Sequence, residues 1–243
     1  MTTRTNSSDK MKRVAVLQSN YIPWRGYFDL LNSVDEFIIY DEVQYTKNDW
    51  RNRNIIKTKN GNIWLTIPVS SSVLLKICEV ETINSLWQKK HYKSIVQSYA
   101  QAPFIEVLRP YLEELYLIKT YRHISEINHS FICFITNYLN IKTKLIMSSS
   151  IPSTKSGKND RLIEILKQRE ANVYITGPAG LNYLDIKAFA QNDIKVQYID
   201  YQNYVDYPQI HGKFSSKVSI VDTLMMLGPQ TIKTFTGEKK YVA

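Results

Sequence analysis

The sequence has few cysteines and no long apolar run. Only Cys78 and Cys133 occur among 243 residues, which excludes a disulfide scaffold. No Cys-x-x-Cys pair or Cys/His cluster accompanies them, so a structural zinc site is not expected. Both have apolar neighbours and are predicted to be buried free thiols, as suits a reducing cytoplasm. A transmembrane helix needs about 18 consecutive apolar residues, and no segment approaches that length.

The N-terminal segment also lacks the apolar stretch of a signal peptide. We therefore expect residues 1–10 to be a disordered tail and residues 11–243 to form a single α/β domain in the cytoplasm. A chain of this length can bury a sizeable core without a disulfide or a metal.

The formal net charge is +9, which suits an anionic partner such as nucleic acid, a membrane surface or a phosphorylated small molecule. The basic residues are scattered, and no zinc-finger or RNA-binding aromatic motif is present. A pocket for a phosphorylated ligand explains the charge at least as well as nucleic acid does. A generally lysine-rich proteome is a further explanation.

Short apolar runs alternate with helical patterns along most of the chain, which predicts a Rossmann-like, mostly parallel sheet with helices on both faces. An Asn-Gly turn at residues 60–61 between two apolar runs predicts a β-hairpin. Residues 86–140 have helical periodicity and are expected to form a helical insertion, or cap. The expected strands are residues 13–18, 36–40, 144–147, 173–176 and 195–199, and the expected helices around them are 24–32, 126–139, 159–170 and 184–192.

Polar side chains follow the first two predicted strands. Ligands of open parallel sheets bind at the carboxyl ends of strands, where helix N-termini also offer free N–H groups. Asp41 and Glu42 end the second strand, and one of them can act as a base or orient an amine, since neighbours point to opposite sides. For the segment after the first strand, the alternative is a tight turn whose Trp24 and Tyr27 pack in the core. For Asp41 and Glu42, the alternative is a solvated loop. The candidate catalytic residues are Gln18, Tyr21, Asp41 and Glu42.

Basic residues interleaved with Asn and Trp follow in residues 47–57. Arginine forks suit phosphates, and Trp50 can stack on a base or sugar ring. The alternatives for this segment are a plain surface loop and a surface that binds nucleic acid. Lys158 and Arg161 open a helix that Asn159 is expected to cap, where they either hold an anion or lie on a surface helix. The candidate binding residues are Asn20, Trp24, Gln44, Lys47, Trp50, Arg51, Asn52, Arg53, Lys158, Arg161, Gly177, Tyr183 and His211.

The last two candidates rest on weaker patterns. Small residues in the stretch 176–184 follow a strand and leave room for a ligand, although such a stretch is more often an ordinary turn. The four histidines show no metal spacing, and only His211, beside a glycine, has a position that favours function.

Several of these segments resemble the WbqC-like protein family. The family signature Gln-x-x-Tyr-x-Pro-Trp-x-Gly-Tyr-Phe matches residues 18–28, Asp-Asp/Glu-Val-Gln-Tyr matches 41–45, and Trp-x-Asn-Arg-Asn/Lys matches 50–54. Further matches lie at residues 66–69, 157–162, 176–179 and 218–222. The likeness covers about residues 12–228. Many members have His-Gln-Pro at residues 17–19 and Phe-x-His at 214–216, whereas this chain has Leu17-Gln18-Ser19 and Phe214-Ser215-Ser216 and so lacks both histidines.

The family is associated with gene clusters for O-antigen and other surface glycans. The resemblance therefore implies an enzyme that transfers an acyl or aminoacyl group to a nucleotide-linked amino sugar, with an acyl-CoA or carrier-protein thioester as donor. A nucleotidyl- or glycosyl-type transferase on nucleotide sugars is one alternative. A non-catalytic protein that binds nucleic acid or a partner is another, so catalysis itself stays open.

Overall fold

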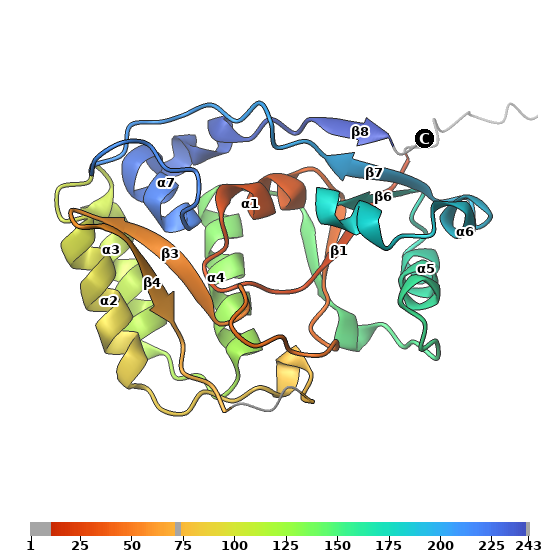
Figure 1. The fold of residues 1–243 in the computed structure, drawn as a ribbon, viewed down its shortest axis with the longest axis horizontal. Coiled ribbons are helices and arrows are strands. Elements are labelled where there is room, and N and C mark those ends of the chain that lie inside the picture. Colours follow the sequence, from red (N-terminus) through yellow and green to blue (C-terminus); the bar gives the residue numbers. More distant parts are fainter. Residues whose placement is uncertain (1–10, 71–73, 242–243) are drawn as a thin grey trace, which may run out of the picture.

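Figure 1 shows the computed structural model of the chain, which describes residues 11–70 and 74–241. The predicted disordered tail, residues 1–10, lies outside the described residues. No helix within these ranges is long and apolar enough to cross a membrane. The strands of the main sheet are β1 (Arg13–Leu17), β2 (Glu36–Ile39), β5 (Lys144–Met147), β6 (Val173–Thr176), β7 (Lys195–Ile199) and β8 (Lys239–Tyr241).

The main sheet has six strands in the order β5-β2-β1-β6-β7-β8. The first five of these run parallel, and β8 pairs antiparallel with β7 at one edge. The chain adds β2 and β5 on one side of β1 and then β6 and β7 on the other. This order confirms the predicted Rossmann-like sheet. It also creates a switch point beside β1, where folds of this kind bind ligands outside the carboxyl ends of the strands.

Helices cover both faces of the sheet, as the sequence predicts (Figure 1). The α-helices are α1 (Arg25–Asn32), α2 (Leu86–Ser98), α3 (Ile105–Glu113), α4 (Ile124–Tyr138), α5 (Lys158–Gln168), α6 (Ile186–Ala190) and α7 (Ile220–Leu227). The short 3₁₀ or π segments are η1 (Ile77–Glu79), η2 (Glu114–Ile118), η3 (Ser148–Ser150), η4 (Pro178–Asn182) and η5 (Gly228–Thr234).

The two faces bury separate apolar clusters, because successive residues of a strand point to opposite sides. Val14 and Val16 of β1 belong to the cluster formed with α5 and α6. Ala15, between them, belongs to a larger cluster that includes residues of α1, α4 and α7.

A separate two-stranded sheet consists of β3 (Arg53–Thr58) and β4 (Gly61–Thr66). Its last pair joins Thr58 to Gly61, so the turn is two residues long. Gly61 has a φ of +103° in open space, a conformation that favours glycine. The predicted hairpin is therefore confirmed, although its turn is formed by residues 59–60 and Gly61 already belongs to β4.

The helical insertion, α2 to α4, packs into the main core. Ile127, Phe131 and Ile135 of α4 share one apolar cluster with Phe28 of α1 and Phe37 of β2. Because a single cluster joins the insertion to the sheet, we propose that residues 11–243 fold as one unit.

Candidate functional site

A cavity of about 440 Å³ lies at the switch point of the sheet. Gln18 contributes to it from the end of β1, Tyr40 and Gln44 from the segment after β2, Lys158 from the first turn of α5 and Tyr174 from β6. Four segments that are far apart in the sequence therefore meet at one crevice. Of the predicted site residues, Gln18, Gln44, Lys158 and Tyr183 line it. We call it the switch-point cavity.

The side of the cavity nearest α5 carries a cation and a carboxylate. Arg161 of α5 approaches Glu42 with 3.3 Å between Nη2 and Oε2, and its guanidinium lies 5.1 Å from the centre of the Tyr40 ring. Tyr40 and Lys158 line the cavity itself, and Lys158 is exposed in the first turn of α5. The predicted residues Arg161 and Glu42 thus lie beside the cavity rather than apart from it.

Asn159 does not cap α5, contrary to the prediction. The N-cap position is Gly157, and no side chain of the described residues accepts a hydrogen bond there. The Asn159 amide instead donates to the carbonyl of Tyr183 at 3.2 Å and accepts from the backbone N–H of Asp185 at 3.1 Å. It therefore ties the start of α5 to the loop after β6, while the carboxylate of Asp160 in the first turn lies against the N-cap Gly157.

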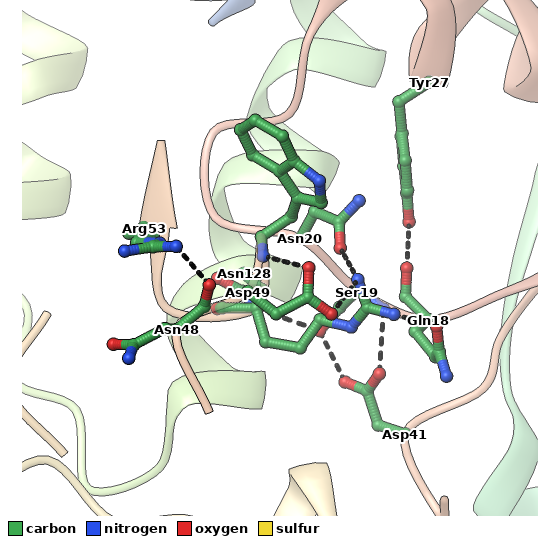
Figure 2. A network of polar contacts seen from close by, with 11 residues as sticks. Gln18, Ser19, Asn20, Tyr27, Asp41, Asn48, Asp49, Arg53 and Asn128 are labelled. Carbon is green, nitrogen blue, oxygen red and sulfur yellow. Dashed lines mark hydrogen bonds and ion pairs between the residues drawn. The ribbon is translucent and has the colours of Figure 1, made fainter. Parts of the chain in front are cut away.

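Asp41 lies on the opposite side of the sheet from Glu42, as strand alternation predicts. Its carboxylate accepts from the backbone N–H of Ser19 at 2.8 Å and from the Ser19 hydroxyl at 2.6 Å. Asn128 of α4 donates to the same hydroxyl at 3.1 Å (Figure 2). Burial raises the pKa of Asp41, and the two bonds from Ser19 oppose that rise. With only 2% of its surface exposed, Asp41 joins two loops and has little access to a ligand.

Arg51 connects this polar cluster to the cavity. Its guanidinium donates to Gln18 and, at 3.0 Å, to Asn20, and it forms an ion pair with Asp49 at 3.4 Å. The Arg51 carbonyl accepts from Asn128 at 2.9 Å. Figure 2 shows its partners Gln18, Asn20, Asp49 and Asn128. Arg51 therefore orients Gln18, which lines the cavity. Its guanidinium already has three partners within the protein, namely Gln18, Asn20 and Asp49.

Three other predicted residues take part in packing, Tyr21 and Asn52 as buried residues and Trp24 as a partly buried one. Tyr21 is fully buried, with its hydroxyl 2.8 Å from His91 Nδ1 and 2.5 Å from the Tyr116 hydroxyl. Trp24 packs edge-on against Tyr201, with ring centres 4.8 Å apart. Asn52 donates to the Ile67 carbonyl at 2.9 Å. The structure thus places these side chains away from the switch-point cavity.

The remaining predicted residues lie on the surface or in another loop. Trp50 is 45% exposed, and its ring centre is 5.6 Å from that of Trp64 on β4. Arg53 stacks on Trp64 at 4.4 Å, and the nearby Lys47 is exposed. His211 lies 2.7 Å from the Ser98 carbonyl through Nε2. Gly177 directly follows β6 in an extended conformation, and so borders the loop that carries Tyr183.

Sequence reasoning missed two groups of residues. Tyr40 and Tyr174 line the cavity, but in sequence they are ordinary aromatic residues of strands. Ser19 and Asn128 complete the Asp41 cluster, and nothing local marks an asparagine inside an apolar helix as its partner. In the ranges that the structure describes, no group of three or more His, Cys, Asp or Glu side chains is placed to hold a metal ion.

Comparison with known proteins supports the resemblance drawn from the motifs. Residues 18–234 match the WbqC-like protein family. A protein of Mycobacterium tuberculosis (strain ATCC 25618 / H37Rv), "Uncharacterized protein Rv1507c", is 41% identical over 222 residues, which cover 90% of this chain and 96% of that protein. Residues 18–234 include Gln18, the cavity residues on α5 and β6, and the whole Asp41 cluster.

Proposed function

Because this chain belongs to the WbqC-like protein family, we propose that it is a transferase of surface-polysaccharide biosynthesis that works in the cytoplasm. Its substrate in this proposal is a nucleotide-linked amino sugar, and the group transferred is an acyl or aminoacyl group. The observation that carries the proposal is the switch-point cavity, which gathers Gln18, Gln44, Lys158 and Tyr183 from separate segments.

The first turn of α5 suits the phosphates of such a substrate. A helix N-terminus presents free N–H groups and a partial positive charge to an anion. Here the N-cap is Gly157, Lys158 lines the cavity, and Arg161 lies one turn further along beside it. A formal net charge of +9 favours the approach of a phosphorylated ligand to this chain.

The rest of the cavity suits a ring. Tyr40, Tyr174 and Tyr183 supply aromatic surface, and the amides of Gln18 and Gln44 supply donors and acceptors. Small-molecule sites are commonly lined by apolar and aromatic side chains with a few polar groups, in volumes of about 300–1,000 Å³. We assign the aromatic part to the base or sugar and the start of α5 to the phosphates.

Glu42 is the carboxylate that we assign to the chemistry. An amine that attacks an acyl donor must lose a proton, and a carboxylate within reach can accept it. Asp41 is buried and accepts two hydrogen bonds from Ser19, whereas Glu42 is half-buried and lies beside the cavity next to Arg161. Of the two adjacent carboxylates, Glu42 is therefore the proposed general base.

A second candidate function is binding of single-stranded nucleic acid, which the exposed Trp50 and Trp64 with the stacked Arg53 favour. Aromatic side chains beside basic ones stack on bases without sequence preference. Binding of this kind would depend steeply on salt concentration and on Trp50.

Ligand-dependent thermal stability tests the proposal. A ligand at about a hundred times its dissociation constant adds about 2.7 kcal/mol of stability. We expect UDP-linked amino sugars to raise the melting temperature, and Lys158→Ala to weaken their binding at least tenfold. Lys167→Ala, at the other end of α5, is the matched control and should bind as the unmodified chain does. A stabilisation that Lys158→Ala leaves unchanged, or one produced only by oligonucleotides, would contradict the proposal.

A further inference from the structure

A second cavity, of about 500 Å³, lies along one side of α4. Tyr111 of α3 and Glu114 of η2 form one part of its wall, with Lys119 directly after η2. His129 and Cys133 of α4 form the opposite part. We call it the α4 cavity. None of its lining residues contributes to the switch-point cavity.

The two α4 residues form a direct thiol–imidazole contact. They are four positions apart, so their side chains lie on the same face of the helix. The sulfur of Cys133 is 3.3 Å from Nε2 of His129, and both side chains are half-buried in the cavity wall. A thiol beside an imidazole is the arrangement in which a general base activates a cysteine nucleophile.

Burial disfavours the charged forms of both groups, and each group has one charged neighbour that opposes this effect. Burial lowers the pKa of His129, and the carboxylate of Asp41 opposes that change. Burial raises the pKa of Cys133, and the ammonium group of Lys119 opposes that change. The resting pair is therefore a neutral thiol and a neutral imidazole. When the thiol attacks, Asp41 stabilises the positive charge that develops on His129. Lys119 stabilises the negative charge that develops on the sulfur of Cys133. Lys119 itself pairs with Glu114 at 2.9 Å.

We propose that the α4 cavity is a second reactive site, in which Cys133 takes an acyl group from a thioester with His129 as general base. The sulfur of Cys133 attacks the thioester carbonyl while His129 accepts the thiol proton. The carbon–sulfur bond of the donor then breaks, and His129 returns the proton to the departing thiolate. The products are an acyl thioester on Cys133 and a free thiol, so no oxidant, reductant or further reactant is required. The choice of an acyl thioester rests on the proposed function, whereas the reactivity of the pair rests on its own geometry.

Cys78 provides a matched control within the same chain. It is also a free, half-buried thiol. Burial raises its pKa, and the carboxylates of Glu79 and Asp41 raise it further. Its thiolate is thus disfavoured by its charged neighbours, whereas Cys133 has an imidazole and a nearby ammonium group.

Alkylation by iodoacetamide, followed by mass spectrometry, tests the reactive pair. Cys78→Ser leaves Cys133 as the sole thiol, and Cys133→Ser leaves Cys78. We expect Cys133 to react at least tenfold faster than Cys78, and His129→Gln in the Cys78→Ser background to slow Cys133 at least tenfold. Peptide mapping of the unmodified chain gives the first comparison without any variant. Equal rates for the two thiols, or a rate that His129→Gln leaves unchanged, would overturn the proposal.

Incubation with acetyl-CoA tests the acyl step. We expect an acetyl group on Cys133 that hydroxylamine removes and that is absent from Cys133→Ser. Rapid alkylation without any acetyl adduct would overturn the assignment to acyl transfer. Acetylation of Cys133 needs no sugar, so an adduct formed by a protein that binds no nucleotide sugar would support this site and contradict the proposed substrate.

Discussion

Ser19 and Asp41 join the loops that follow β1 and β2, with the Ser19 backbone nitrogen 2.8 Å from Oδ1 and its hydroxyl 2.6 Å from Oδ2. Both residues are buried. Ser19→Ala removes one acceptor bond of a buried carboxylate, so we expect it to lower the free energy of unfolding by about 1–3 kcal/mol. Urea denaturation measures the change. The exposed Ser149→Ala is the control, with an expected change within about 0.5 kcal/mol; equal effects would contradict the assigned role of the pair.

The two adjacent carboxylates are expected to differ in what they support. Glu42→Gln should lower kcat for acyl transfer from acetyl-CoA to a UDP-linked amino sugar by a factor on the order of 10²–10⁴, since a general base is lost. Stability should change by less than about 1 kcal/mol, because the contact with Arg161 is half-exposed.

Asp41→Asn, in contrast, should lower the stability clearly, because an amide nitrogen cannot accept the hydrogen bond that the Ser19 hydroxyl donates. We expect a loss of about 1–3 kcal/mol in unfolding free energy. A Glu42→Gln variant with unchanged turnover, or an Asp41→Asn variant as stable as the parent, shows that the roles have been assigned wrongly.

His91 should make the protein less stable in mild acid. Burial lowers its pKa to about 4 in the folded state, whereas an unfolded histidine titrates at about 6.5. Between these values the unfolded chain binds a proton that the folded chain does not, so stability falls as the pH decreases through this window, by about 3 kcal/mol in total. Denaturation at a series of pH values measures the fall. His91→Gln, which cannot titrate, should flatten it; an identical pH dependence in the variant refutes the assignment.

Two glycines with nearly the same positive φ should respond differently to substitution. Gly212 and Gly228 have φ values of +54° and +53°. No atom of the described residues lies within 4 Å of a Cβ added at Gly212, whereas one at Gly228 would be 2.3 Å from Cε1 of Phe104. We expect Gly212→Ala to cost about 1–2 kcal/mol from the backbone alone, and Gly228→Ala to cost about 1–3 kcal/mol more from overpacking. Thermal denaturation of both variants checks the difference, and equal losses would mean that Phe104 moves aside.

The parts of the fold that could be predicted are those with local signals. The strands at residues 144–147, 173–176 and 195–199 were predicted with the bounds that the structure gives, because each is a short apolar run bounded by polar or small residues. Four of the candidate residues, Gln18, Gln44, Lys158 and Tyr183, line one cavity, because parallel strands end at the same edge of a sheet.

What could not be predicted depends on contacts between distant segments. Tyr21 follows Asn20 directly, yet Ile22 has a φ of +36° and the Tyr21 ring enters the core beside His91. Helix α7 was not predicted, and it buries six of its eight residues, the polar Asp222 and Thr223 among them. Strand β8 is recognisable only through its antiparallel pairing with β7. The predicted buried thiol of Cys133 is half-buried beside His129, since one side of α4 faces a cavity rather than the core.

The central position of β1 has a consequence for folding during synthesis. β1 pairs with β2 soon after both are made, but its other edge pairs with β6, at Val173 and Tyr174. At about 5–20 residues per second, the ribosome needs on the order of ten seconds to make the chain between them. During that interval the strand that becomes the centre of the sheet has one open hydrogen-bonding edge, the kind of edge through which chains associate. We therefore expect chaperones to protect this protein mainly during synthesis, before β6 has been made.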